Sequence, residues 1–354
     1  MHKGVATVAQ LENFDEIIDV RTPAEFAEDR IPGAINLPVL DNEQRIVVGT
    51  IYKQQSPFEA RRIGGAMVAE NIARHVYGYM HDKPKRWRPL VYCWRGGQRS
   101  GAFVTWLRMI GWDAHQLAGG YKQFRHHVIE TLQTVVPQLK LRMVCGATGS
   151  AKTRVLEALA RHGAQVLDLE DLAAHKGSVL GALPDRPQPT QKAFETGIYE
   201  CVRRFDPSRT VFVEAESRKI GRAHVPDPLI DAMRAAACLC VEAERDARLA
   251  FLVRDYAYLG ADIPALRSNI ERLQGLQSKE TISRWHELAA LGDMPTLFGE
   301  LIDLHYDPLY RRSQGGNFAG LSSAPRFHTA DLSPDGIDRL AREILATLTT
   351  QFGD

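Results

Sequence analysis

A cysteine and an arginine stand at the two ends of a glycine-containing turn, CWRGGQRS at positions 93–100. An apolar run precedes the turn and a helical pattern follows it, which predicts a strand, a tight loop and a helix start. Backbone N–H groups at a helix N-terminus attract anions and favour a thiolate. We therefore predict that Cys93 is a nucleophile and that Arg99 binds an oxyanion through two donors. The predicted oxyanion loop between them consists of Trp94, Arg95, Gly96, Gly97 and Gln98.

The two glycines of this turn are expected to let the backbone bend inward without a Cβ clash. The alternative interpretation is a buried cysteine at a strand end beside an unrelated surface arginine, because free cysteines are usually small core residues. That alternative leaves two glycines and two arginines of one short turn unexplained, so we favour the nucleophile.

A second loop, GATGSAKT at 146–153, lies between an apolar run and a helical pattern that ends near Gly163. This is the context that a phosphate-binding P-loop requires. Lys152 is predicted to neutralise phosphate and Thr153 to be able to reach a magnesium ion. Ala151 replaces the second glycine of the motif, so the turn either survives or forms an altered pocket; a glycine-serine turn without a ligand is the alternative. The predicted phosphate-binding residues are Gly146, Thr148, Gly149, Ser150, Ala151, Lys152 and Thr153.

Acidic and basic residues follow the apolar run VFVEAE at 211–216. Glu214, or else Glu216, is a candidate for the acidic residue of a Walker-B strand, and solvated side chains at a strand end are the alternative. His175 is a candidate for the same site or a plain surface residue. The basic residues lie where α/β proteins bind ligands, so we expect them to contact nucleic-acid phosphates: Arg218, Lys219 and Arg222.

Short strand-like runs alternate with helical patterns, which predicts an α/β fold in two domains, residues 1–135 and 136–354. The final hundred residues are expected to be mostly helical. Two helices are predicted from buried faces, one at Ala102, Phe103, Trp106, Leu107 and Ile110, the other at Phe194, Ile198, Cys201, Val202 and Phe205. The predicted strands lie at 17–20, 35–38, 90–93 and 114–117, and then at 141–145, 165–169, 211–216 and 238–243.

The composition is that of an ordinary globular protein, with 354 residues, 44% hydrophobic and 25% charged, and a net charge of +1. Any polyanion must therefore meet a local basic patch. No signal peptide and no run long enough to span a membrane is found. Five scattered cysteines argue against a disulfide framework and for the reducing cytoplasm.

Four segments of the first domain resemble the rhodanese family: IIDVRTPAEF (17–26), RIPGAINLP (30–38), the cysteine loop and LAGGYKQFR (117–125). The resemblance covers about residues 5 to 130 and implies a rhodanese-like domain whose loop cysteine, here Cys93, carries a chalcogen. The loop is one residue longer than the usual sulfurtransferase loop and is similar to that of cysteine-dependent cell-cycle phosphatases. A phosphorylated chalcogen donor would suit the longer ring.

The whole chain resembles the bacterial tRNA 2-selenouridine synthases. The resemblance rests on the cysteine loop, LAGGYKQFR and the variant P-loop, followed in order by HKGSVLG (175–181), QPTQKAFE (188–195) and VEAESRKIG (213–221). It implies a rhodanese-like domain followed by a P-loop NTPase-like α/β domain with a mostly helical C-terminal part.

The resemblance also implies a two-step reaction on 2-thiouridine at the wobble position of tRNA. Geranyl diphosphate first geranylates the sulfur, and selenium from selenophosphate then replaces it through a selenide on Cys93. No tightly bound cofactor is expected, although Mg²⁺ fits the P-loop chemistry. Expected partners are the tRNA and the selenophosphate synthetase that supplies the donor; no membrane partner is expected, and the chain is expected to be a monomer.

A basic stretch, HDKPKRWRP at 81–89, places four cations around Trp87 and predicts stacking on an unpaired base, with a solvated charged face as the alternative.

Three other functions stay open at this point. The Cys-x5-Arg spacing also fits a phosphatase or arsenate reductase, which leaves the second domain without a role. A rhodanese sulfur carrier fused to an ATPase is the second alternative, and a non-enzymatic tRNA-binding protein with vestigial sites is the third.

Overall fold

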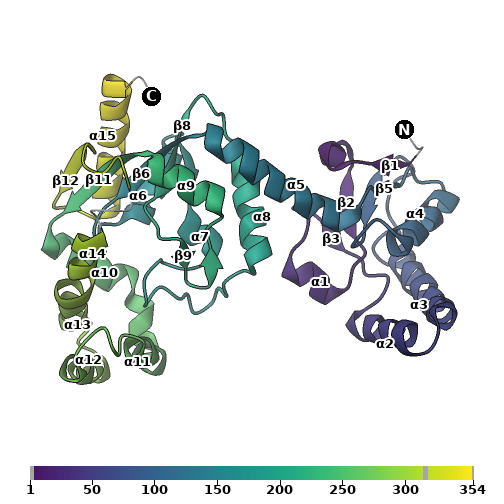
Figure 1. Cartoon of the computed structure of the whole chain (residues 1–354), viewed down its shortest axis with the longest axis horizontal. Helices are drawn as coiled ribbons and strands as arrows, with labels where there is room; N and C mark the ends of the chain where they lie inside the picture. The colour runs from purple at the N-terminus through teal and green to yellow at the C-terminus, as the bar shows by residue number, and fades with distance from the viewer. Residues whose placement is uncertain (1–3, 314–317, 353–354) are drawn as a thin grey trace. The chain divides into compact units, whose positions relative to one another are not determined.

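The computed structural model describes residues 4–313 and 318–352, and the chain divides into two compact units, residues 1–131 and 132–354. The division falls within helix α5 (Gly120–Val135), which both units share (Figure 1). Each unit contains one five-stranded parallel sheet. The predicted α/β class is therefore confirmed in both halves of the chain.

The sheet of the first unit has the order β1-β5-β4-β2-β3. All four residues of β4 are buried, as expected for a central parallel strand. In chain order the strands are β1 (Val5–Ala6), β2 (Glu16–Asp19), β3 (Ile35–Asn36), β4 (Pro89–Tyr92) and β5 (His115–Leu117). The helices are α1 (Pro23–Glu28), α2 (Asn42–Gln54), α3 (Pro57–Tyr77) and α4 (Gln98–Ile110).

Helix α4 follows the cysteine loop, and its buried face differs in part from the prediction. Phe103 and Leu107 are buried as expected, but Trp106 and Ile110 are 46% and 48% exposed, and Val104 is buried in their place. Because successive helix residues are about 100° apart, residues 103, 104 and 107 share one side of the helix and 106 turns away from it, whereas Ile110 lies on the side of Phe103 but is the last residue of the helix. The paired helices α2 and α3 were not predicted, since their apolar residues do not follow a single strong stripe.

The sheet of the second unit has the order β12-β11-β6-β8-β7. After β6 the chain adds strands on one side, and it then crosses to the other side for β11 and β12. The strand order thus reverses at β6, and parallel sheets bind ligands at the carboxyl ends of the strands at such a point. In chain order the strands are β6 (Lys140–Cys145), β7 (Gln165–Leu167), β8 (Thr210–Glu214), β11 (Ala237–Ala243) and β12 (Arg326–Thr329).

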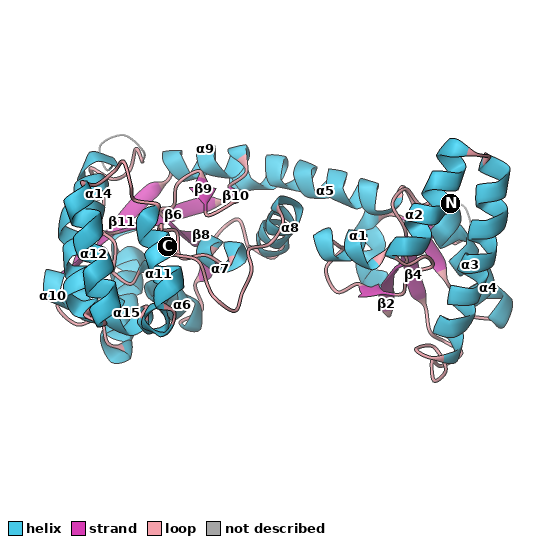
Figure 2. Ribbon diagram, turned by 90° about the horizontal axis from the view of Figure 1, so that it is seen from below, coloured by secondary structure: helices cyan, strands magenta, loops and turns pink. Residues whose placement is uncertain are grey.

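Helices cover both faces of this sheet, with α9 on one face and α6 and α15 on the other (Figure 2). The predicted face of α8 is confirmed at Phe194, Ile198 and Val202, whereas Phe205 lies beyond the helix end. The helices are α6 (Lys152–Arg161), α7 (Leu169–Ala173), α8 (Gln191–Val202), α9 (Asp227–Ala235), α10 (Arg245–Asp255), α11 (Ile263–Glu271), α12 (Lys279–Leu291), α13 (Met294–Leu301), α14 (Asp307–Ser313) and α15 (Pro334–Phe352). A short hairpin of β9 (Lys219–Ile220) and β10 (Ala223–His224) follows β8.

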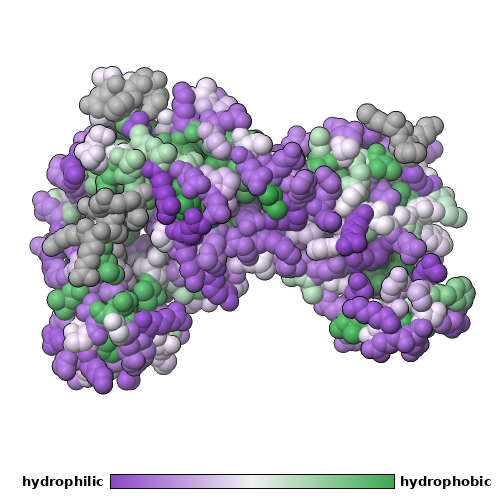
Figure 3. All heavy atoms as spheres, in the orientation of Figure 1, coloured by the Kyte–Doolittle hydropathy of each residue, from purple (hydrophilic) through white to green (hydrophobic). Residues whose placement is uncertain are grey.

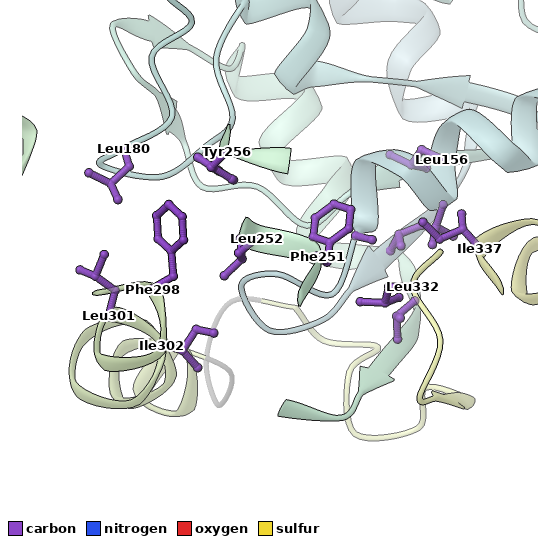
Figure 4. Packing of buried hydrophobic residues seen from close by; sticks show 14 of the residues in the cluster. Leu156, Leu180, Phe251, Leu252, Tyr256, Phe298, Leu301, Ile302, Leu332 and Ile337 are labelled. Carbon is purple, nitrogen blue, oxygen red and sulfur yellow. The ribbon is translucent and has the colours of Figure 1, made fainter. Parts of the chain in front are cut away.

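The main core of the second unit joins its sheet to the C-terminal helices. Figure 4 shows Leu180, from the loop after α7, beside Tyr256 and the Phe298 and Leu301 side chains of α13. The loop that carries HKGSVLG is thereby anchored in the core. Hydrophilic residues dominate the face of the molecule seen in Figure 3, with hydrophobic residues in separate patches. Within residues 4–313 and 318–352, the helices are too short or too polar to cross a membrane.

Candidate active sites

Cys93 lies directly after β4, where the chain turns into α4. Cys93 is 3% exposed and belongs to a hydrophobic core cluster with Val91 and Phe103. Its Sγ accepts hydrogen bonds from the backbone N–H of Gly97 (3.3 Å) and from the Ser100 hydroxyl (3.1 Å). Two donors thus converge on the sulfur, an arrangement that suits a sulfur atom carrying negative charge.

Glycines allow this loop to touch the segment that begins α5. Gly96 has φ +64°, and a Cβ there would lie 2.7 Å from the Leu117 carbonyl oxygen. Gly120 has φ +58°, and a Cβ there would lie 2.3 Å from the Cys93 carbonyl oxygen. The expected need for glycine is confirmed for Gly96 and is wrong for Gly97, which has φ −98° and open space around it.

The glutamine of β5 holds the loop from the other side. Gln116 Nε2 donates to the carbonyl oxygens of Gly96 (2.8 Å) and Gly97 (3.0 Å) and lies 2.9 Å from Ser100 Oγ. Neither Gln116 nor Ser100 was predicted. Ser100 could have been predicted from the sequence, because it lies in the first turn after the loop. The role of Gln116 depends on the pairing of β4 with β5, which its residue type does not reveal.

Arg99 pairs with Glu25 of α1, with Nη1–Oε2 at 2.8 Å and Nη2–Oε1 at 3.3 Å. Burial acts to raise the pKa of Glu25, but its hydrogen bond and ion pair with Arg99 outweigh burial, so the pKa lies below its ordinary value. The carboxylate therefore occupies the two donors that were predicted to bind an oxyanion. An incoming oxyanion must share Arg99 with Glu25 or displace it. Glu25 was not predicted, although it lies in the segment RTPAEF.

The other loop residues differ in exposure. The ring of Trp94 lies 5.3 Å from the ring of Tyr121, while Arg95 and Gln98 are exposed. Gln98 is the first residue of α4.

The glycine-rich loop joins β6 to α6 as predicted, and its backbone departs from ordinary geometry at three positions. Gly149 has φ +83°, and a Cβ there would lie 3.0 Å from Leu252. Gly146 is close-packed too, since a Cβ there would lie 2.4 Å from Ser150 Oγ. Ala151 caps α6 in the left-handed conformation, with φ 59° and ψ 31°. The loop therefore keeps the backbone shape for which the missing glycine would be favoured, and Ala151 bears the strain.

Arg248 of α10 fixes the far side of this loop. Its Nε donates to the Thr148 carbonyl oxygen (2.8 Å), and its Nη2 pairs with Asp307 (2.6 Å). Lys152 Nζ donates to the Gly146 carbonyl oxygen (3.1 Å). The lysine thus folds back over the loop, where its charge faces the cavity described below.

Carboxylates gather around the start of α6. The Thr153 hydroxyl donates to Glu170 (2.6 Å), whose backbone N–H donates to Glu214 (2.6 Å). Burial and the charges of neighbouring carboxylates raise the pKa of Glu214 well above its ordinary value and that of Asp168 to about 6. Burial and the charge of Glu170 raise the pKa of Glu216 to about 8. The interpretation of Glu214 as a solvated residue is wrong, since it is fully buried.

Asp168 and Glu170 were not predicted. The signal was available, because Asp168 lies near the end of the strand run QVLDL, Glu170 follows the run, and the carboxyl ends of neighbouring parallel strands meet at one edge of a sheet. Parallel pairing of β7 with β8 brings this end beside Glu214.

A cavity of about 430 Å³ opens over these groups. Lys152, Thr153, Glu170 and Glu216 line one part of it, and Phe251, Leu252, Tyr256 and Tyr306 line another. The cavity therefore combines a phosphate-binding loop with an apolar wall.

The HKGSVLG loop closes one side of this cavity. Its Gly177 has φ +63°, and a Cβ there would lie 2.5 Å from Glu170 and 2.7 Å from Glu216. His175 also lines the cavity and is 9% exposed, so its interpretation as a plain surface residue is wrong. Burial, with the charge of Arg272, lowers the pKa of His175.

Magnesium suits the oxygen atoms of Thr153 and Glu170. However, within the described residues no three histidine, cysteine or acidic side chains are arranged to hold a metal ion. Mg²⁺ commonly binds through one or two protein oxygens together with substrate phosphates. The residues thus fit a metal that arrives with a phosphorylated substrate.

The second basic segment begins two residues after Glu216, which lines the cavity, and the first does not form the expected stacking surface. Arg218 pairs with Asp227, while Lys219 and Arg222 are exposed on the β9–β10 hairpin. Trp87 is 4% exposed and is packed against Trp112, so it cannot stack on a base. Two cations of that stretch are also engaged in ion pairs: Lys83 with Glu16, and Arg88 with Asp113.

Two family models match the chain. A model described as a rhodanese-like domain matches residues 5–127, and one described as a tRNA 2-selenouridine synthase AAA domain matches residues 139–283. Curated tRNA 2-selenouridine synthases from Nitrosomonas europaea, Nitrosomonas eutropha and Alcanivorax borkumensis are 34%, 36% and 35% identical to the chain. These alignments cover 74%, 68% and 69% of this chain and 71%, 62% and 67% of the three relatives.

Proposed function

The chain belongs to the tRNA 2-selenouridine synthase family, and on that premise we propose that it converts 2-thiouridine in tRNA to 2-selenouridine. The observation that carries the proposal is the presence, in one chain, of a cysteine with two donors on its sulfur and a lysine-bearing phosphate loop. Each site suits one step of a two-step replacement of sulfur by selenium.

In the first step the P-loop holds geranyl diphosphate. Loop N–H groups and Lys152 bind the diphosphate, which becomes the leaving group. The sulfur of 2-thiouridine attacks C1 of the geranyl group, forms a C–S bond and releases diphosphate. If Mg²⁺ accompanies the diphosphate, Thr153 and Glu170 would hold it, and it would neutralise phosphate charge. The apolar wall of the same cavity provides a surface for hydrocarbon.

In the second step the selenium of selenophosphate attacks C2 of the base and expels geranyl thiolate, which is a better leaving group than sulfur of a thiocarbonyl. The Cys93 thiolate then attacks the phosphorus, the Se–P bond breaks, and its electron pair stays on the selenium of the base. Water hydrolyses the S–P bond, which releases phosphate and regenerates Cys93. A selenide on Cys93 itself would need a two-electron oxidant, because selenium in selenophosphate is already at the selenide level.

Two substitutions separate the steps. Cys93→Ser should abolish the formation of 2-selenouridine while geranylation continues, because the nucleophile that takes the phosphoryl group from selenium is lost while the P-loop is intact. Lys152→Ala should slow geranylation and leave selenation of pre-geranylated tRNA unchanged. Mass spectrometry of the modified nucleosides distinguishes these products. Cys201→Ser and Lys140→Ala are controls that change the same residue types elsewhere. Selenation by Cys93→Ser, or normal geranylation by Lys152→Ala, would contradict the assignment of that site.

The rest of the proposal concerns partners. The substrate is tRNA with 2-thiouridine at the wobble position, and a selenophosphate synthetase supplies the donor. The enzyme acts as a monomer without a tightly bound cofactor. Sedimentation of the purified chain with and without tRNA tests the monomeric state.

A further inference from the structure

A second cavity, of about 280 Å³, lies on another side of the glycine-rich loop. Cys145 and Gly146, at the start of that loop, line it together with Glu216. Glu216 also lines the first cavity. The two cavities therefore meet at one carboxyl group, at the carboxyl end of β8.

The walls of the second cavity are apolar and partly aromatic. Ile230 and Met233 of α9 contribute from one element, and both are buried. Tyr310 of α14 and Phe318, in the segment that follows it, contribute two rings (α9 and α14 are labelled in Figure 1). Such walls accept a flat ring, since stacking on aromatic side chains needs only a π-face.

The rim of this cavity carries positive charge. Arg234 and Arg218, the latter paired with Asp227, line it, and the exposed Lys219 and Arg222 lie on the hairpin that follows Arg218. Enzymes that act on a base take it out of the stack into a pocket with apolar or aromatic walls, while cations outside contact the phosphates. A hydrocarbon chain would need neither cations at the entrance nor a carboxyl group at the inner end.

We propose that this second cavity receives the flipped thiolated pyrimidine of the RNA substrate, with Glu216 facing the polar edge of the base. The inference rests on the proposed function, because it takes the RNA substrate from it. The phosphorylated substrate then enters through the first cavity and the base through the second, and the two reacting atoms meet near Glu216.

Photocrosslinking tests the placement directly. The full chain is irradiated with an anticodon stem-loop RNA that carries a single 4-thiouridine at the wobble position, and the crosslinked peptide is identified by mass spectrometry. A crosslink to Tyr310 or Phe318 is expected. A crosslink confined to Tyr256 or Phe251 of the first cavity would overturn the inference.

Binding of the same RNA, measured by fluorescence anisotropy, gives a second test. Phe318→Ala should weaken binding about tenfold through lost stacking. Arg234→Glu should weaken it and reduce the salt dependence by about one unit of slope or more. Arg342→Glu, an exposed charge reversal on α15, is the control. Unchanged affinity in both variants would overturn the inference.

Two further outcomes separate this inference from the proposed function. If Phe318→Ala raises the KM for geranyl diphosphate and leaves RNA affinity unchanged, the cavity holds the prenyl chain and the inference is wrong. If the wild-type chain binds no RNA even at low salt, the proposed function fails along with it. If the wild-type chain binds the RNA but the crosslink lies outside the second cavity, only the assignment of the base to that cavity is wrong.

Discussion

Replacing Ala151 by glycine would measure the strain in the variant phosphate loop. At φ 59° a Cβ approaches the following carbonyl oxygen, which costs about 1–2 kcal/mol compared with glycine. Glycine removes that strain. It also removes a buried methyl group, which costs about 0.8 kcal/mol of folding free energy. In addition it raises the conformational entropy of the unfolded chain, which costs about 0.5–1 kcal/mol more. These terms nearly cancel, so Ala151→Gly should leave the stability of the second unit almost unchanged.

Ala158→Gly provides the matched comparison, since Ala158 is fully buried in the same helix but has ordinary helical geometry. The same methyl group and the same chain entropy are lost, with no strain to relieve. This variant should therefore lose about 2 kcal/mol of unfolding free energy. The difference between the two variants is thus about 1–2 kcal/mol.

Native-state hydrogen exchange of the full chain resolves this difference within the second unit. Amides of β6 and α6 should exchange on the order of 10-fold faster in Ala158→Gly than in Ala151→Gly, since 1.4 kcal/mol corresponds to a factor of ten. Equal acceleration in both variants would show that the left-handed backbone at Ala151 stores no strain, and the reasoning would be refuted.

Three further substitutions have defined expectations. Gly120→Ala should distort the loop and slow alkylation of Cys93, because its Cβ would meet the Cys93 carbonyl oxygen, whereas Gly97→Ala should react at the wild-type rate. Ser100→Ala should slow the same alkylation about fivefold, because a donor worth about 1 kcal/mol to the charged sulfur is lost. Glu216→Gln should flatten the pH dependence of stability. With a folded-state pKa of about 8, the Glu216 carboxyl group holds a proton in the folded chain that the unfolded chain releases above about pH 4.5. Melting temperatures of the wild type should therefore fall as the pH rises toward about 8, while those of the variant change less.

The sequence predicted both loops because each combines a strand, glycines and a helix start within a few residues. Local pattern was sufficient for the strands beside Cys93 and Lys152. It was insufficient for Glu25 and Gln116, since their contacts with the cysteine loop depend on strand order and on segments far away in the chain. Trp87 shows the opposite error: its basic neighbours predicted an exposed ring, but packing against Trp112 buries it.

The second cavity could not be predicted from the local sequence pattern either. Its walls come from α9 and from the segment around Tyr310 and Phe318, and its inner end comes from the ends of β6 and β8. Only the crossing of the chain at the centre of the sheet brings these parts together. The basic residues after β8 were found in the sequence because they immediately follow a strand end, where ligand sites of parallel sheets occur.

The edge strand β12 gives the second sheet a particular order of assembly. Residues 326–329 pair with β11 only after the whole helical stretch 245–313 has been synthesised. While the ribosome is making those helices, the outer edge of β11 has no strand beside it. An unpaired edge is a template for association with other chains. Nascent chains that stall before residue 326 should therefore be the species most dependent on chaperones during production of this protein.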